Sequence, residues 1–139
     1  MKLVIDAPIA LAWLFERNKM EEVNYANRVL SVMSKAETTV PNIWHLEVTN
    51  ALLIAEKQNI MTDALVIDYL NRLSQLGIKT DEVITETRRD FLLSFARQHQ
   101  LSLYEITYLE LSLRTHSALA TFNQKLAAAT RAAGGTIFI

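Results

Sequence analysis

Short apolar runs alternate with longer amphipathic segments along the whole chain. The runs have the length of buried strands, and the segments repeat apolar residues at the three- and four-residue spacing of a helix. The predicted strands are Lys2–Ile5 (KLVI), Thr38–Val40 (TTV), Ser117–Thr121 (SALAT) and Thr136–Ile139 (TIFI). The predicted helices are Ala7–Phe15, Met20–Ala36, Ile43–Lys57, Thr62–Leu76, Val83–Gln98, Ser102–Thr115 and Gln124–Ala133.

Short apolar strands separated by helices predict an α/β fold with a central parallel sheet flanked by helices. In such sheets, binding sites form beyond the carboxyl ends of the strands. Asp6 directly follows the first predicted strand, and Asn123 follows the strand Ser117–Thr121 by two residues. Both residues are therefore expected at the edge where a site would form.

Composition narrows the class of protein. The 139 residues fit a single domain spanning 1–139, and half of them are apolar, as in a globular protein. The net charge of −1 argues against a large basic surface, although a nuclease acting on one exposed phosphodiester remains compatible with it. The chain has no cysteine, no stretch that would span a membrane and no pattern of a signal peptide, so we expect a cytoplasmic protein.

Glu47 is the most informative polar residue, because helical spacing puts it in the middle of an apolar face. The apolar neighbours on that face are Ile43, Trp44, Ala51 and Ile54. A buried carboxylate needs a cation, a metal or several hydrogen-bond donors. Asn50, one turn further on, borders the same face and is a candidate to orient Glu47.

Asp6 has two interpretations. An aspartate between a strand and a helix is a favoured N-cap, and Pro8 fits the first turn of that helix. Asp6 and Glu47 together would instead suit Mg²⁺ or Mn²⁺, which prefer oxygen ligands.

Several segments, in this order and spacing, resemble the PIN-domain family, and in size and pattern its VapC-type toxins. The segments are LVIDAPIALAWLF, VPNIWHLEVTNALL, LSLYEITYLELSLRTHSALATFNQKLAAA and GGTIFI. The resemblance implies a Rossmann-like PIN fold and an Mg²⁺- or Mn²⁺-dependent endoribonuclease that cleaves RNA. It also implies a frequent homodimer and inhibition by a small antitoxin protein.

The resemblance also implies a set of site residues. The family's first two acids correspond to Asp6 and to Glu47, the latter in a Glu-x-x-Asn pattern with Asn50. Its third acid, usually an aspartate after a tyrosine, is Glu105 after Tyr104. Its fourth, usually the aspartate of a Thr-x-Asp signature, is Asn123 after Thr121 and Phe122. Another departure is Pro8, where the family often has a small hydroxyl residue.

The departures at Glu105 and Asn123 leave open whether the site is active. Glu105 keeps the charge on a longer side chain, whereas Asn123 loses it and has no group that can act as a general base. A single metal held by Asp6 and Glu47, with help from Glu105, remains compatible with these residues. Equally, Glu105 fits a capping box with Ser102, and Asn123 fits an N-cap. The alternative function is therefore a PIN-like domain with a degenerate site that binds a protein or RNA without cleaving it.

Three other groups of residues complete the expectations. Lys125, one turn from the predicted site, is a candidate to contact RNA phosphates. Glu110 and Arg114 form an i,i+4 pair that we interpret as solvated helix surface. The apolar residues of Thr62–Leu76 are expected to be core or, by the resemblance, a face for a second copy or an antitoxin helix.

Overall fold

The computed structural model describes residues 1–81 and 86–139 and contains five strands and seven helices in these ranges. The strands are β1 (Lys2–Ile5), β2 (Glu37–Pro41), β3 (Lys79–Asp81), β4 (Ala118–Ala120) and β5 (Thr136–Ile137). The helices are α1 (Ala7–Leu11), α2 (Met20–Met33), α3 (Asn42–Lys57), α4 (Asp63–Ser74), α5 (Glu86–His99), α6 (Leu103–Arg114) and α7 (Gln124–Ala132).

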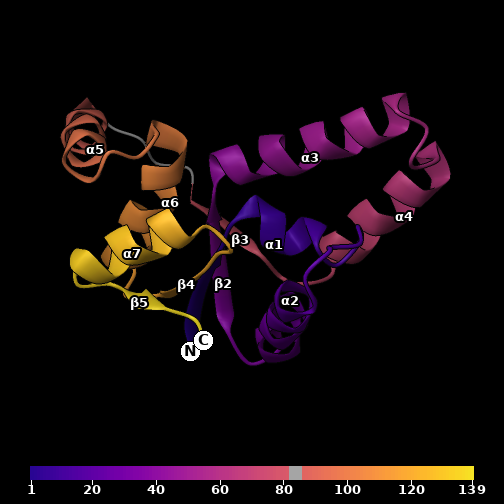
Figure 1. Ribbon diagram of the computed structural model, residues 1–139, viewed down its shortest axis with the longest axis horizontal. Helices are drawn as coiled ribbons and strands as arrows, with labels where there is room; N and C mark the ends of the chain where they lie inside the picture. The colour runs from indigo at the N-terminus through magenta and orange to yellow at the C-terminus, as the bar shows by residue number, and fades with distance from the viewer. Residues whose placement is uncertain (82–85) are drawn as a thin grey trace.

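The strands form one sheet in the order β3-β2-β1-β4-β5, and every pair is parallel. In Figure 1, α6 and α7 lie on one side of the sheet with α5 outside them, and α1, α2, α3 and α4 lie on the other. The predicted α/β fold with a central parallel sheet is therefore confirmed, and the arrangement is Rossmann-like. Within the described residues, no helix combines the length and the apolar character that crossing a membrane requires.

The core forms around β1, the central strand of the sheet. Leu3, Val4 and Ile5 of β1 are fully buried, as expected for a strand covered on both faces. Helix α6 packs over β1, β2 and β4 and contributes fully buried leucine and isoleucine side chains. These side chains are Ile106, Leu109 and Leu111.

Two element predictions were wrong. Strand β3 was not predicted, because its sequence KTD is short and polar and the strand lies at an edge of the sheet. Helix α1 ends at Leu11 rather than at Phe15, and Trp13 turns away so that its indole Nε1 donates to the Ala26 carbonyl at 2.9 Å. The apolar residues after Leu11 pack on the core from a turn rather than from a helix.

Helix α7 ends at Ala132, within one residue of its predicted end at Ala133. The chain leaves the helix at Gly134, where φ is 87°, a conformation that suits glycine. The predicted start of α5 at Val83 lies outside the described residues.

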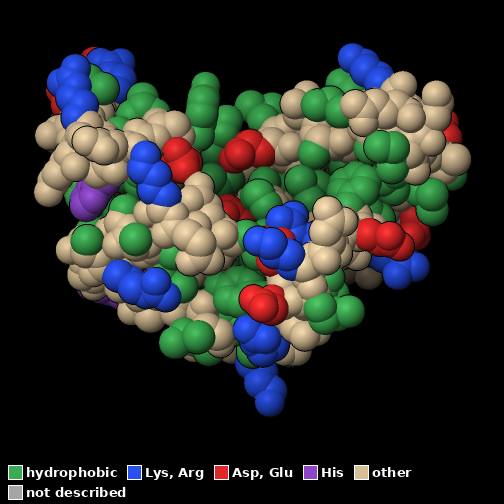
Figure 2. All heavy atoms as spheres, viewed as in Figure 1, with side chains coloured by type: hydrophobic (Ala, Val, Ile, Leu, Met, Phe, Trp, Pro, Cys, Tyr) green, Lys and Arg blue, Asp and Glu red, His purple; other side chains and the backbone are tan. Residues whose placement is uncertain are grey.

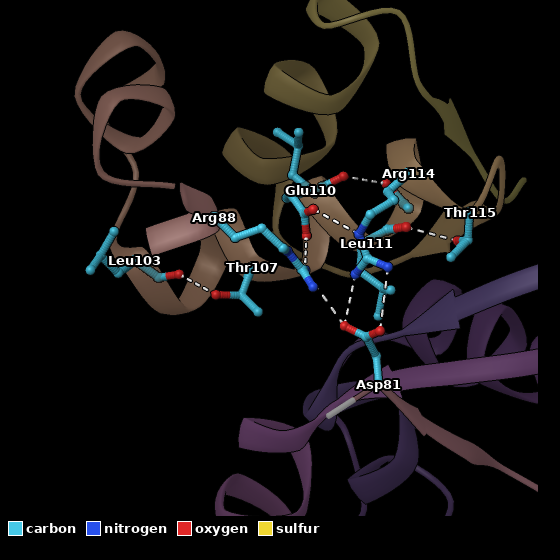
Figure 3. A network of polar contacts seen from close by, with 10 residues as sticks. Asp81, Arg88, Leu103, Thr107, Glu110, Leu111, Arg114 and Thr115 are labelled. Atoms are coloured by element: carbon cyan, nitrogen blue, oxygen red, sulfur yellow. Dashed lines mark hydrogen bonds and ion pairs between the residues drawn. The ribbon is translucent and has the colours of Figure 1, made fainter. Parts of the chain in front are cut away.

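A partly buried ion network joins β3, α5 and α6 (Figure 3). Glu110 is only 6% exposed and accepts hydrogen bonds from Arg88 at 2.7 Å and from Arg114 at 2.8 Å. Arg114 also donates to Asp81 at 2.7 Å. The interpretation of Glu110 and Arg114 as solvated surface was therefore wrong for Glu110, because α5 and β3 cover it.

The strand order places a topological switch point between β1 and β4. From β1 the chain builds the sheet outward through β2 and β3, and it then returns to the other side of β1 with β4. Ligand sites of open α/β sheets form at such a point, beyond the carboxyl ends of the strands. Ile5 pairs with Ala120 there, so the residues that follow, Asp6 and Thr121, lie next to each other.

Candidate active site

Asp6 lies at the switch point and is 6% exposed. One of its oxygens accepts a hydrogen bond from the Ile9 backbone N–H at 3.3 Å, so the predicted N-cap is present. The other accepts from the Thr121 hydroxyl at 2.5 Å. Burial, with a smaller contribution from the nearby Glu47 carboxylate, raises the pKa of Asp6 to about 7 against the effect of these two hydrogen bonds.

Glu47 reaches toward Asp6 from α3, but it is half-buried rather than central on the apolar face. The buried stripe of α3 is formed by Trp44, Val48, Leu52 and Ala55. Glu47 borders that stripe, and its Oε1 accepts a hydrogen bond from the Tyr108 hydroxyl at 2.5 Å. Asn50 is exposed, and no hydrogen bond joins it to Glu47 in the described part of the chain. Tyr108 therefore has the orienting role that was expected of Asn50.

Glu105 and Asn123 both cap helices, and they also bind each other. Glu105 Oε1 accepts from the Ser102 N–H at 3.0 Å, and the Ser102 hydroxyl accepts from the Glu105 N–H at 3.0 Å, which completes the predicted capping box of α6. Asn123 Oδ1 accepts from the Leu126 N–H at 3.1 Å as the N-cap of α7. Asn123 Nδ2 donates to Glu105 Oε2 at 2.6 Å.

These contacts affect the charge of Glu105. The hydrogen bond from the Ser102 backbone, together with those from the Ser102 hydroxyl and Asn123, lowers the pKa of Glu105, and the positive charge of Lys125 lowers it further. Lys125 itself is exposed. Thr121 links the two halves of the site, because its hydroxyl donates to Asp6 and accepts from the Asn123 N–H at 3.0 Å.

The candidate residues Asp6, Glu47, Glu105 and Asn123 line one cavity of about 440 Å³. Figure 2 shows acidic side chains around the hollow at the centre of this face, with basic side chains nearby. The other lining residues are Pro8, Arg17, Glu22, Tyr104, Tyr108, Phe122 and Leu126. The structure thus brings together the four residues that the sequence predicted as catalytic, and it leaves Asn50, Thr121 and Lys125 outside the lining.

Among the cavity residues that sequence reasoning missed are Tyr108 and Arg17. Tyr108 lies one turn after Glu105 on the same helix, so the helical spacing that exposes Glu105 to the site could have revealed it. Arg17 lies in the turn after α1, where no periodic pattern indicates which way a side chain points.

Comparisons with known proteins bear on the fold. No family model and no curated protein matches the chain. A solved structure does match: the crystal structure of PAE2754 from Pyrobaculum aerophilum aligns with a TM-score of 0.68 and 18% identity. The alignment covers 99% of this chain and 88% of that chain. The likeness is one of fold.

Two of the carboxylates that line the cavity, Asp6 and Glu47, are candidates to hold a divalent cation such as Mg²⁺. Among the described lining residues, four carboxylates (Asp6, Glu22, Glu47 and Glu105) face one cationic side chain, Arg17. No group of three or more Asp, Glu, His or Cys side chains in the described residues has the arrangement of a metal site. Mg²⁺ is commonly bound by one or two carboxylates with water completing the shell, so Asp6 and Glu47 are sufficient in number.

Proposed function

We propose that this protein is an Mg²⁺- or Mn²⁺-dependent endoribonuclease of the PIN type that cleaves RNA phosphodiesters. The observation that supports the proposal is the meeting of Asp6 and Glu47 in one cavity at the switch point of the sheet. Two acids from distant parts of the sequence share a site in which burial and the nearby Glu47 carboxylate disfavour the charge of Asp6. A bound divalent cation would remove that repulsion.

The polar residues of the site have separate roles in this proposal. Asp6 and Glu47 would hold the metal, which supplies Lewis-acid activation of water and of a phosphoryl oxygen. The Thr121 hydroxyl fixes one oxygen of Asp6, and the Tyr108 hydroxyl fixes one oxygen of Glu47. Glu105 would assist at the rim.

Asn123 would position water or phosphate through its amide. It has no proton-accepting group for general-base catalysis, and its Oδ1 and Nδ2 both take part in hydrogen bonds to the protein. Its contribution in this proposal is therefore orientation rather than proton transfer.

The test combines metal binding with RNA cleavage. Wild-type protein should bind Mn²⁺ in calorimetry and cleave single-stranded RNA in Mg²⁺ or Mn²⁺, and Glu47→Gln should lose both. Glu56→Gln, on the same helix and outside the cavity, is the matched control and should retain both. Wild-type protein that binds no divalent metal, or a Glu47→Gln variant that cleaves normally, would contradict the proposal.

A second candidate is a PIN-like domain that binds a protein or RNA without cleaving it. It is favoured by the capping contacts that occupy both oxygens of Glu105 and both side-chain polar atoms of Asn123. Under this alternative, wild-type protein cuts no RNA in Mn²⁺ and Asn123→Asp restores cleavage.

The toxin role implies two protein partners in the cytoplasm, a second copy and a small antitoxin. An exposed apolar surface on α3, α4 and the turn between them supports a protein partner here. Its exposed members are Leu46, Leu53, Ile54, Ile60, Leu65 and Ile67. Light scattering of the protein alone should give the mass of a dimer, and Ile67→Glu should give that of a monomer if this surface forms the dimer. An unchanged mass would assign the dimer to another face.

A further inference from the structure

Arg17 has an unusual setting for a surface arginine. It lines the candidate cavity, and it is the one Lys or Arg among the described residues that do so. Its Nη2 donates to Glu22 Oε2 at 3.1 Å, and its guanidinium carbon lies 4.2 Å from the centre of the Phe122 ring. These two contacts hold the guanidinium at the cavity wall.

The Arg17 guanidinium has more N–H donors than there are described hydrogen-bond acceptors around it. An arginine carries five N–H donors, and Glu22 is the one described hydrogen-bond acceptor for them. The Nε atom is buried without a hydrogen-bond partner. The Arg17 side chain as a whole is still 32% exposed, so the guanidinium is open to an additional acceptor in the cavity.

The position of Arg17 connects it to both sides of the switch point. Arg17 follows α1, the helix that Asp6 caps, while Phe122 follows Thr121 after β4. The positive charge of Arg17 also lowers the pKa of Asp6, which places the guanidinium within electrostatic reach of the buried carboxylate. The Phe122 ring covers one face of the guanidinium, and it does not block the Nη groups, which lie in the guanidinium plane.

The charge of the cavity indicates what that ligand is. Four carboxylates among the described lining residues would repel a phosphodiester, so an anionic substrate needs a fixed cation there in addition to any metal. Arginine suits this task because its planar fork matches the oxygens of a phosphate.

We propose that Arg17 binds the phosphodiester of an RNA strand at this site, with Phe122 as the platform that positions its guanidinium. The identity of the substrate rests on the proposed ribonuclease function, whereas phosphodiester binding by Arg17 does not require cleavage. Substrate binding would add phosphate oxygens as acceptors beside Glu22.

The experiment uses a fluorescent single-stranded RNA oligonucleotide in Mg²⁺, with wild-type protein, Arg17→Gln and Arg17→Lys. If the wild type cleaves, KM and kcat are measured; if it does not, Kd is measured by anisotropy. Arg17→Gln should raise KM or Kd roughly tenfold or more, because a charge-assisted hydrogen bond is lost. The KM or Kd of Arg17→Lys should lie between those of the wild type and Arg17→Gln, because lysine keeps the positive charge but lacks the planar set of N–H donors.

Two controls separate binding from structure. Arg72→Gln removes an arginine that is exposed and paired on α4, and it should leave KM or Kd within about twofold, as expected for a surface change. Phe122→Leu keeps the charge of Arg17 and removes its platform, so it should weaken RNA binding while Mn²⁺ affinity stays unchanged. Thermal unfolding shows that each variant is folded.

The outcomes distinguish this inference from the proposed function. A wild type that binds RNA through Arg17 without cutting it would overturn the ribonuclease and support the inference. Equal KM or Kd for wild type and Arg17→Gln would overturn the inference, and so would a wild type with no RNA affinity. A lower melting temperature of Arg17→Gln with unchanged RNA affinity would assign Arg17 a structural role and also overturn it.

Discussion

The side-chain amide of Asn123 donates a hydrogen bond to Glu105 Oε2 at 2.6 Å and so joins the N-cap of α7 to the capping box of α6. One side chain is an anion and the other a neutral donor, so the pair is stable without a cation between them. A second carboxylate in place of the amide would replace this attraction by repulsion between two like charges. Changing this pair therefore tests how strongly the stability of the cavity depends on a metal.

Asn123→Asp should make the folded state depend on divalent metal. Aspartate caps a helix as well as asparagine does, but the donor to Glu105 is replaced by a like charge. We expect a loss of about 1–2 kcal/mol in the free energy of unfolding at pH 7 in EDTA. Mn²⁺ should recover that loss, and its effect on the melting temperature should exceed its effect on the wild type.

Asn123→Ser is the matched control for this prediction. It keeps an N-cap side chain, removes the hydrogen bond to Glu105 and adds no charge. Its melting temperature should not gain from Mn²⁺ more than that of the wild type does. If Asn123→Asp is as stable as the wild type in EDTA, Glu105 and Asn123 are not coupled as the structure indicates.

Tyr108→Phe should weaken metal binding without changing the shape of the cavity wall. The change removes the hydroxyl that donates to Glu47 at 2.5 Å. Loss of a partner that orients a metal ligand typically costs roughly ten- to a hundredfold in metal affinity or activity. Calorimetric titration with Mn²⁺ measures this loss directly.

Tyr69→Phe provides the control for Tyr108→Phe. Tyr69 is also buried, and its hydroxyl donates to the Ala10 carbonyl at 2.7 Å, outside the cavity lining. Both variants should lose about 1 kcal/mol of stability with the hydrogen bond, but Mn²⁺ affinity should fall in Tyr108→Phe alone. A similar affinity in both variants would show that Glu47 does not depend on Tyr108.

The titration of Asp6 should make stability fall as pH rises. Its pKa is about 7 in the folded protein against 3.8 for an ordinary aspartate, so between these values the native state keeps a proton that the unfolded state has released. The destabilisation is absent below about pH 4 and complete above about pH 7. It reaches at most about 4 kcal/mol, because a difference of one in pKa between the folded and unfolded states corresponds to about 1.4 kcal/mol.

Asp6→Asn should remove this pH dependence, since an amide does not titrate. The variant should gain stability over the wild type as the pH of urea unfolding in EDTA rises from 4 to 7. Asp90→Asn, at an exposed position of α5, should follow the wild-type profile. A constant difference between Asp6→Asn and wild type across this range would place the titration elsewhere.

The parts of the site that follow strands could be predicted from the sequence. Asp6 comes directly after one apolar run and Asn123 follows another by two residues, and parallel strands present their carboxyl ends at one edge. Their capping contacts were predictable too, because an N-cap side chain accepts a hydrogen bond from the backbone N–H three residues later in the chain. Local order in the chain was enough for both conclusions.

The parts that depend on packing between distant elements were not predictable. Helical spacing put Glu47 among apolar residues, but the approach of α6 decided that it borders the buried stripe and meets Tyr108. Glu110 looked like helix surface until α5 and the unpredicted strand β3 covered it. In both cases the partner lies more than twenty residues away in the sequence.

The network around Glu110 gives a large predicted effect on stability. Glu110→Ala would leave the guanidinium of Arg88, itself little exposed, without the carboxylate that accepts its hydrogen bond at 2.7 Å. Breaking a buried ion pair by removing one partner costs about 3–5 kcal/mol, and the loss here should lie at the lower end because Asp81 still pairs with both arginines. The exposed pair between Arg72 and Asp68 is the control, since Asp68→Ala should cost less than about 1 kcal/mol. Urea unfolding measures both, and equal costs would mean that solvent reaches Glu110 despite its 6% exposure.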